Sequence, residues 1–165
     1  MINIILKDGS VKKYSEETSV ISIANDISEG LARNVISAKF NEKVIETNSI
    51  IREDGKLEFY TWDNDDGKKA FWHSSSHVMA QSIQELFPEA KLTIGPAINN
   101  GFYYDVDLGD KKISESDFEK IETRMLEICR EKHDFKLRLV SKKDALKFYK
   151  KQNNDYKIEL INDLN

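Results

Sequence analysis

Two histidines four residues apart are the residues in this chain whose types and spacing most directly suggest chemistry. His73 and His77 enclose three serines in the segment HSSSH, and residues four apart on an α-helix project from the same face. Imidazole titrates near neutral pH, so a pair can move protons, orient a water molecule or bind a metal. Glutamate does not follow His73, so the metalloprotease motif H-E-x-x-H does not apply. Three interpretations stay open here: two ordinary surface histidines, a metal-binding pair and an acid–base pair.

The helix expected around these histidines has an apolar stripe to which they do not belong. At about 100° per residue, the stripe is formed by Trp72, Met79, Ile83, Leu86 and Phe87. His73 and His77 lie roughly 100–140° from Trp72 on the same projection. We therefore expect the two histidines at the border between a packed face and an opening, and not in the centre of a core.

A cysteine and a third histidine form a second group. Cys129 and His133 have the spacing C-x-x-x-H, and together with His73 and His77 they would make a set of four zinc ligands. Helical geometry argues against this set, because Cys129 falls inside the apolar stripe of the helix expected over residues 115–132. A buried cysteine most often acts as a small hydrophobic residue. We expect Cys129 in the core, and the zinc site remains the alternative.

A sharply turned segment follows the histidine helix. Residues 94–107 read IGPAINNGFYYDVD, in which Asn-Asn-Gly is a hairpin turn signal. Strand alternation places Phe102, Tyr104 and Val106 on one face. The segment is consistent with an ordinary half-buried strand, but it also allows the Tyr104 phenol to point into a cleft beside the histidines.

The first sixty residues are expected to form a small module of their own. Asp8-Gly9 lies between two short β-prone segments and predicts a hairpin. Ser19 is a suitable N-cap for a helix, and Gly30 is a suitable residue to end it. Further short strands follow, and the order hairpin, helix, strands is typical of an α+β module of the β-grasp kind.

The polar segment DNDDG, residues 63–67, is the best linker candidate, and it divides the chain into residues 1–62 and 63–165. In the second part Ser114 is expected to cap a helix, with Asp117 completing a capping box. The second part is therefore also α+β, with a long histidine-bearing helix packed on an antiparallel sheet. The expected helices cover residues 68–87, 115–132 and 142–151, and the expected strands cover residues 92–98, 102–106, 136–140 and 157–161.

Composition excludes several classes of protein. The chain has 165 residues, a formal net charge of -4 and 39% hydrophobic residues, which argues against wholesale disorder. It has no apolar run of about 20 residues that could span a membrane, and its first residues do not form a secretory signal. The single cysteine fits a reducing cytoplasm, and the acidic balance argues against nucleic-acid binding through bulk charge. A local cluster of lysines at positions 142, 143, 147, 150 and 151 is interpreted as a solvated helix face.

Taken together, three motifs resemble the amino-terminal half of the threonyl-tRNA synthetase family. They are Trp72-His73-Ser74-x-x-His77, Ile94-Gly95-Pro96 and Asn100-Gly101-Phe102-Tyr103-Tyr104-Asp105. Residues 1–62 are similar to its TGS domain, a β-grasp module, and residues 63–165 resemble the start of its editing domain, including the segment YKIELI at 156–161. Alanyl-tRNA synthetases share a related H-x-x-x-H domain but not this arrangement.

The resemblance implies a role for the histidines. A site that selects threonine cannot strongly exclude serine, because one methyl group is worth only about 1–3 kcal/mol. The family therefore hydrolyses mischarged seryl-tRNA(Thr) at a second site. By resemblance, His73 and His77 are the catalytic residues of this editing site, with acid and base roles unassigned, and Tyr104 and Lys157 line its pocket.

The resemblance also implies what lies elsewhere. The family completes the editing pocket with a C-x-G-P-H segment, and this sequence ends at Asn165, before such a segment. The class II core, with its sites for ATP, magnesium and zinc, and the anticodon-binding domain are not in these residues either. We expect a truncated editing domain that is inactive by itself, with no cofactor or metal of its own. The parent would be a cytoplasmic enzyme, not bound to membranes, that binds tRNA(Thr) and forms a homodimer through the missing domains.

A different class of protein remains as the alternative. A freestanding TGS-containing protein could bind RNA or a regulator without catalysis, and its histidines would then be vestigial.

Overall fold

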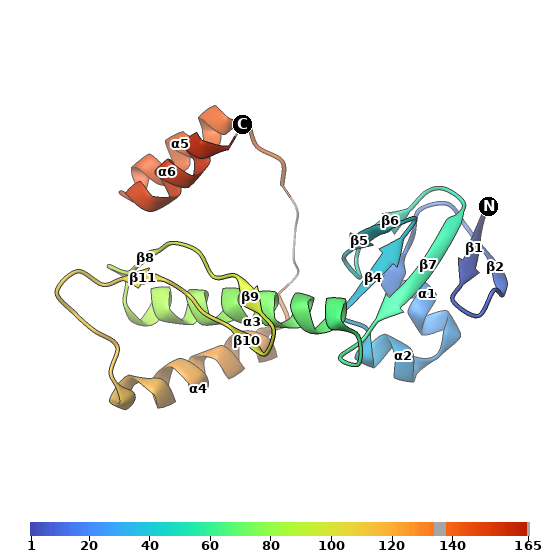
Figure 1. Ribbon diagram of the computed structural model, residues 1–165, viewed down its shortest axis with the longest axis horizontal. Helices are drawn as coiled ribbons and strands as arrows, with labels where there is room; N and C mark the ends of the chain where they lie inside the picture. The colour runs from blue at the N-terminus through green and yellow to red at the C-terminus, as the bar shows by residue number, and fades with distance from the viewer. Residues whose placement is uncertain (134–137, 165) are drawn as a thin grey trace. The chain divides into compact units, whose positions relative to one another are not determined.

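The computed structural model describes residues 1–133 and 138–164. By its internal contacts the chain divides into two compact units, Met1–Trp72 and His73–Asn165, whose elements are labelled in Figure 1. The division falls inside helix α3 (Asp65–Leu86). The linker expected over residues 63–67 is shorter in the structure, because Asp65 and Asp66 already lie in the first turn of α3. Acidic side chains stabilise this turn by interacting with the positive end of the helix dipole.

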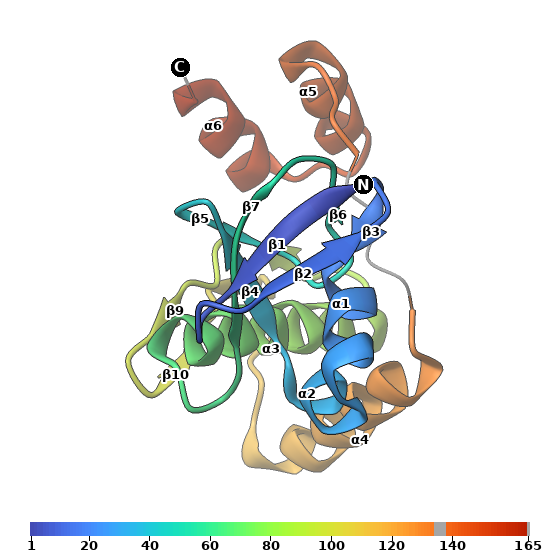
Figure 2. The same ribbon diagram turned by 90° about the vertical axis from the view of Figure 1, so that its right-hand side faces the viewer.

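The first unit is built on a five-stranded sheet in the order β2-β1-β7-β4-β5. Strand β1 pairs with β7 in parallel. The other pairs of this sheet are antiparallel, namely β1 with β2, β4 with β7 and β4 with β5. A two-stranded ladder of β3 and β6 accompanies the sheet, and helices α1 and α2 are visible in Figure 2. The bounds are β1 (Ile2–Leu6), β2 (Val11–Tyr14), β3 (Thr18–Ser19), α1 (Val20–Ile27), α2 (Glu29–Asn34), β4 (Ser37–Phe40), β5 (Lys43–Ile45), β6 (Ile50–Ile51) and β7 (Gly55–Tyr60).

Local sequence explains most of this unit. Ile2 and Ile4 alternate along β1 and are buried against Val20 and Ile23 of α1. The Ser19 hydroxyl accepts a hydrogen bond from the backbone N–H of Ser22, so the predicted cap is confirmed. The fold is the hairpin, helix and further strands that the sequence predicts.

The prediction that Gly30 ends this helix is wrong. Helix α1 ends at Ile27, and Gly30 lies within α2. Ser28 separates the two helices, because its backbone N–H is bonded to the carbonyl of Ala24 while its hydroxyl accepts from the N–H of Leu31. One extended serine therefore ends one helix and caps the next.

The second unit combines helices with short antiparallel pairs. Strand β8 pairs with β11. Strands β9 and β10, which lie between β8 and β11 in the sequence, pair with each other. The two long strands predicted here are interrupted around Pro96, which has no N–H to donate. Backbone hydrogen bonds from Thr93 to Asp105 and from Asp105 to Ile94 bridge the interruption. The bounds are β8 (Lys91–Leu92), β9 (Ala97–Ile98), β10 (Gly101–Phe102), β11 (Val106–Asp107), α4 (Glu115–Glu131), α5 (Lys142–Lys151) and α6 (Asp155–Asp163).

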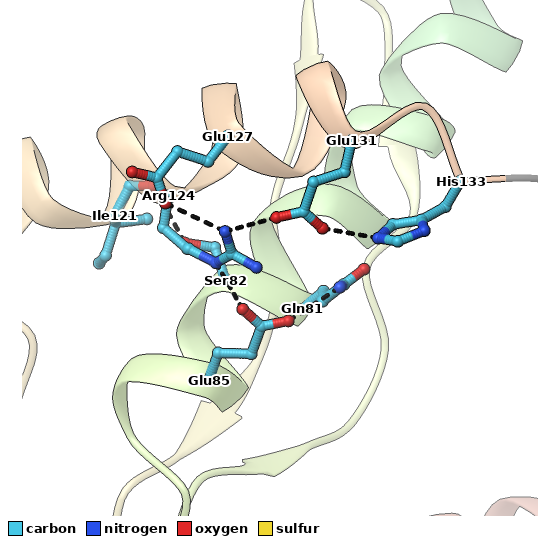
Figure 3. Close-up of polar contacts among 8 residues, drawn as sticks. All are labelled: Gln81, Ser82, Glu85, Ile121, Arg124, Glu127, Glu131 and His133. Carbon is cyan, nitrogen blue, oxygen red and sulfur yellow. Dashed lines mark hydrogen bonds and ion pairs between the residues drawn. The ribbon is translucent and has the colours of Figure 1, made fainter.

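Helix α4 fixes the helix that carries the histidines. Its buried Ile121 packs against Ile83 of α3, and the fully buried Ser82 hydroxyl donates to the carbonyl of Ile121 at 3.0 Å. Figure 3 shows Arg124 of α4 reaching across to α3. Its guanidinium bonds to three carboxylates, those of Glu85 (2.5 Å), Glu127 (3.0 Å) and Glu131 (2.8 Å). The predicted helix over residues 115–132 and its capping box of Ser114 and Asp117 are confirmed.

The strand predicted over residues 157–161 is wrong, because these residues lie in α6. Asn154 explains the helix, since its side chain accepts from the N–H of Lys157 and so acts as an N-cap. Ile158 and Ile161, three residues apart, are both half-buried, a helical and not a strand period. The strand predicted over residues 136–140 lies partly outside the described residues, and residues 138–140 form no strand. Helix α5 has the bounds that the sequence predicts.

Candidate functional site

The two histidines of α3 are in direct contact. His73 Nε2 and His77 Nε2 lie 3.1 Å apart, and the ring planes meet at 82°. A hydrogen bond at this distance needs one protonated and one unprotonated nitrogen. While it lasts, the two rings together can carry one positive charge but not two. The pair can therefore take up or release a single proton.

The environment favours the neutral form of His77. Partial burial lowers the pKa of His77 below its ordinary value of 6.5, and the charges of His73 and Lys157 lower this pKa further. His77 is therefore unprotonated at neutral pH and available to accept a proton. Both rings still reach solvent, which agrees with the predicted position at the border of a packed face.

A buried serine between the histidines joins α3 to the segment before β9. The Ser76 side chain is fully buried, and its Oγ lies 2.7 Å from the carbonyl oxygen of His73 and 3.0 Å from that of Gly95. Gly95 in turn lies beneath the ring of Tyr104, because a Cβ at Gly95 would come within 2.1 Å of Tyr104 Cδ2. Ser76 and Gly95 thus set the distance between the histidine helix and the Tyr104 ring.

The predicted site residue Lys157 lies near the pair, although on a helix and not on a strand. Its ammonium donates to the backbone carbonyl of Thr93, two residues before Gly95. Burial lowers the pKa of Lys157, and its charge acts on His77. Asn154 supports this placement from within the buried region, because its Oδ1 accepts from the N–H of Lys157 and its Nδ2 donates to the carbonyl of Leu92 at 3.4 Å.

Tyr104 borders two hollows of the second unit. One has a volume of about 720 Å³ and also includes Tyr156, whose hydroxyl donates to Asp107 at 2.9 Å. The other, of about 700 Å³, extends from Tyr104 to Ile83. Burial raises the pKa of the Tyr104 phenol, which therefore stays protonated and can donate a hydrogen bond. Gly95 connects Tyr104 to the histidine helix through Ser76. Among the described residues, Tyr104 forms no hydrogen bond or ring contact with either histidine.

The second group of candidate ligands does not assemble. Cys129 is exposed, so the prediction that it lies in the core is wrong. The buried side of α4 is centred on Ile121 and Ile128, and Cys129 lies about 80° from Ile121 on the helix. His133 is paired with Glu131 at 2.6 Å. In residues 1–133 and 138–164, no three histidine, cysteine or acidic side chains are grouped so that they could hold a metal ion.

Sequence reasoning missed three residues of this site: Ser76, Gly95 as a packing partner of Tyr104, and Asn154. Asn154 had a usable signal, because an asparagine followed directly by an aspartate is a common helix start. The contact of Ser76 with Gly95 had none, since it joins residues 19 apart.

Comparisons with known proteins agree with this architecture. The family model of the TGS domain matches residues 2–61. The threonine–tRNA ligases of Flavobacterium psychrophilum and Flavobacterium johnsoniae are 59% and 58% identical to the chain over 164 residues, and that of Cytophaga hutchinsonii is 43% identical over the same length. Each match covers 99% of this chain and 25% of the relative.

The chain thus spans about a quarter of the length of the curated relatives that it matches. In the described part of the chain, no helix combines the length and the apolar character that a membrane crossing requires. From the matched TGS domain and the similarity along nearly all of its residues, we conclude that the chain corresponds to the amino-terminal region of threonine–tRNA ligases.

Proposed function

We propose that this chain supplies the TGS domain and an editing site of a threonine–tRNA ligase. The parent enzyme joins threonine to tRNA(Thr) with ATP, and the site around His73 and His77 hydrolyses seryl-tRNA(Thr). The observation that supports this most is the 3.1 Å contact of the two imidazoles, one of which is held neutral, with the Lys157 ammonium nearby. The names of the relatives supply the substrate.

Hydrolysis of an aminoacyl ester needs three things that this arrangement offers. A water molecule must be oriented, its proton must be accepted as its oxygen attacks the ester carbon, and a proton must reach the ribose oxygen as the C–O bond breaks. The histidine pair can accept the first proton and return one to the ribose, because it exchanges a single charge. The acid and base roles stay unassigned between the two rings.

Lys157 is suited to hold the polar end of the substrate. One of its three N–H donors is used by the Thr93 carbonyl, which fixes the ammonium and leaves two donors for an ester oxygen or a phosphate. Tyr104 provides a protonated phenol and, through its packing on Gly95, part of the wall that limits the size of the side chain admitted.

Within this proposal, aminoacylation belongs to the remaining three quarters of the ligase. The class II core with its ATP, magnesium and zinc sites, and the homodimer interface, would lie there. The 165 residues by themselves would then not charge tRNA and would edit weakly. The parent would act in the cytoplasm.

A chimera tests the editing role. The matching quarter of the Flavobacterium psychrophilum ligase is replaced by this chain, and hydrolysis of seryl-tRNA(Thr) is measured. His73→Ala and His77→Ala should each slow hydrolysis by about 100-fold or more, as expected for loss of acid–base catalysis, without changing the rate of threonine charging. His133→Ala is the matched control and should have no effect. Hydrolysis at the parental rate in both site variants would contradict the assignment.

A further inference from the structure

Helix α5 has an exposed row of lysines that the editing site does not use. Lys143, Lys147, Lys150 and Lys151 are all exposed, and they form what we call the lysine stripe. Their spacing places them within about 100° of one another around the helix and along about 12 Å of its axis. The stripe faces away from Ala145 and Tyr149, which are half-buried on the side of α5 that packs against α6.

The charges of the stripe have no partner in the described part of the chain. In the described ranges 1–133 and 138–164, none of the four ammonium groups forms an ion pair or a hydrogen bond. Asp144, the acidic residue of α5, is bonded to the Ser141 N-cap at 2.7 Å. Lys142 differs from the stripe, because its ammonium donates to the backbone carbonyls of Asn162 and Leu164 and so anchors the end of α6.

Helix stability accounts for only part of the stripe, because Lys150 and Lys151 lie in the last turn of α5, where the helix dipole favours cations. Lys143 and Lys147, and likewise Lys147 and Lys151, are like charges four residues apart, which destabilise a helix. Lys143 also lies in the first turn, where the helix dipole disfavours a cation. Helix α4 shows the opposite pattern, because the charge of Arg124 is surrounded by carboxylates.

The stripe also contrasts with the rest of the chain. The protein has a net charge of -4, yet 5 of its 25 basic residues lie in the ten residues of α5. Such a local concentration of positive charge allows a protein of acidic net charge to attract a polyanion. Phe148, 55% exposed, borders the stripe and offers a ring on which a base can stack.

We propose that the lysine stripe of α5 binds the phosphate backbone of RNA. Lysine binds phosphate as a flexible point charge, and a straight row of four suits successive phosphates of one strand. The other side of α5 packs against α6, the helix that carries Lys157 of the proposed editing site. The inference rests on the proposed function in one respect, namely that the RNA is the tRNA whose ester the histidine pair receives.

The salt dependence of binding tests the proposal with the full 165-residue chain. Its affinity for a fluorescent tRNA(Thr) transcript is measured by anisotropy between 50 and 200 mM KCl, roughly the range over which phosphate contacts change affinity most visibly. The triple variant Lys143→Gln, Lys147→Gln, Lys151→Gln should bind about tenfold more weakly, and the slope of log K against log [KCl] should fall by about two to three. Circular dichroism checks that α5 remains folded.

A matched control separates the stripe from net charge. The variant Lys43→Gln, Lys112→Gln, Lys120→Gln removes three exposed lysines from outside α5 and should keep nearly the parental slope. An equal loss in this control, or no measurable binding by the parent at the lowest salt, would overturn the proposal. So would stripe-dependent binding to vesicles of phosphatidylserine and phosphatidylcholine in the absence of tRNA binding.

The result can be separated from that of the editing test. His73→Ala removes the proposed hydrolysis but should leave the affinity and the salt slope unchanged. If the histidine variants of the chimera hydrolyse seryl-tRNA(Thr) at the parental rate but the stripe variant binds tRNA more weakly, only the catalytic assignment is refuted. If the histidine variants lose hydrolysis but the stripe variant keeps the parental salt dependence of tRNA binding, only the RNA surface is refuted.

Discussion

The hydroxyl oxygen of Ser76 lies 3.0 Å from the carbonyl oxygen of Gly95, and this contact joins the histidine helix to the segment beneath Tyr104. Ser76 is fully buried and also lies 2.7 Å from the carbonyl of His73. The single hydroxyl proton of Ser76 can therefore be donated to either of two carbonyl oxygens, that of His73 on α3 or that of Gly95 beside Tyr104. The geometry of the histidines relative to Tyr104 depends on this residue, although it touches neither ring in the contacts described above.

Replacing Ser76 by alanine should destabilise the second unit. The substitution removes the donor to the carbonyl of half-buried Gly95, and the loss of such a hydrogen bond costs about 0.5–1.5 kcal/mol. Urea unfolding of the chain, followed by circular dichroism, measures the change. Ser74→Ala, at an exposed position of the same helix, is the control and should change stability by less than about 0.5 kcal/mol. Equal effects of the two substitutions would show that the Ser76 contact contributes nothing.

Replacing Gly95 by alanine should displace the Tyr104 ring. The new Cβ would lie 2.1 Å from Tyr104 Cδ2, so the ring must move, and such overpacking costs about 1–3 kcal/mol. In a Tyr104→Ala background the same substitution should cost much less, because the obstructing ring is gone. Gly30→Ala provides a control of opposite sign, since Gly30 lies inside α2 with its nearest contact at 3.9 Å. A cost at Gly95 that persists without the Tyr104 ring would exclude this packing as the cause.

Elements whose signals are local could be predicted from the sequence. Ser19, and Ser114 with Asp117, cap helices as expected, because a cap needs only residues within one turn. The prediction failed at α6, where a strand was expected over residues 157–161 although Asn154 caps a helix. It also failed for Cys129, because the burial of α4 depends on which part of its apolar side faces α3.

The candidate site also combines features that the local sequence predicts with contacts that it does not. His73 and His77 share one face of α3, as their spacing predicts, and the structure adds the direct contact of their rings. The contacts of Lys157 with Thr93, and of Ser76 with Gly95, join residues 64 and 19 positions apart. No local pattern contains such contacts, so they follow from the fold alone.

The charge of Lys157 should be visible in the titration of His77. Lys157 contributes to the lowered pKa of His77, after burial and the charge of His73. Lys157→Gln removes the charge at similar volume, so the pKa of His77 should rise toward 6.5. Histidine chemical shifts recorded by NMR between pH 4.5 and 8, roughly two units on either side of the ordinary value, measure it. Lys91→Gln, which removes a lysine paired with Asp155, should leave the titration unchanged, and an equal rise in both variants would refute a direct effect of Lys157.

The Arg124 cluster should make the second unit sensitive to acid. Hydrogen bonds from Arg124 lower the pKa values of Glu85 and Glu131 below their ordinary value of 4.5. A carboxylate with a lowered folded pKa stabilises the fold above its unfolded pKa, and this stability is lost as pH falls through the folded value. The free energy of unfolding should therefore decrease below pH 4.5, and Arg124→Gln should make this decrease shallower. Urea unfolding at a series of pH values measures both slopes. Arg130→Gln, at an exposed position on the same helix, should keep the parental pH dependence. A slope that Arg124→Gln leaves unchanged would show that Glu85 and Glu131 are not stabilised by the guanidinium.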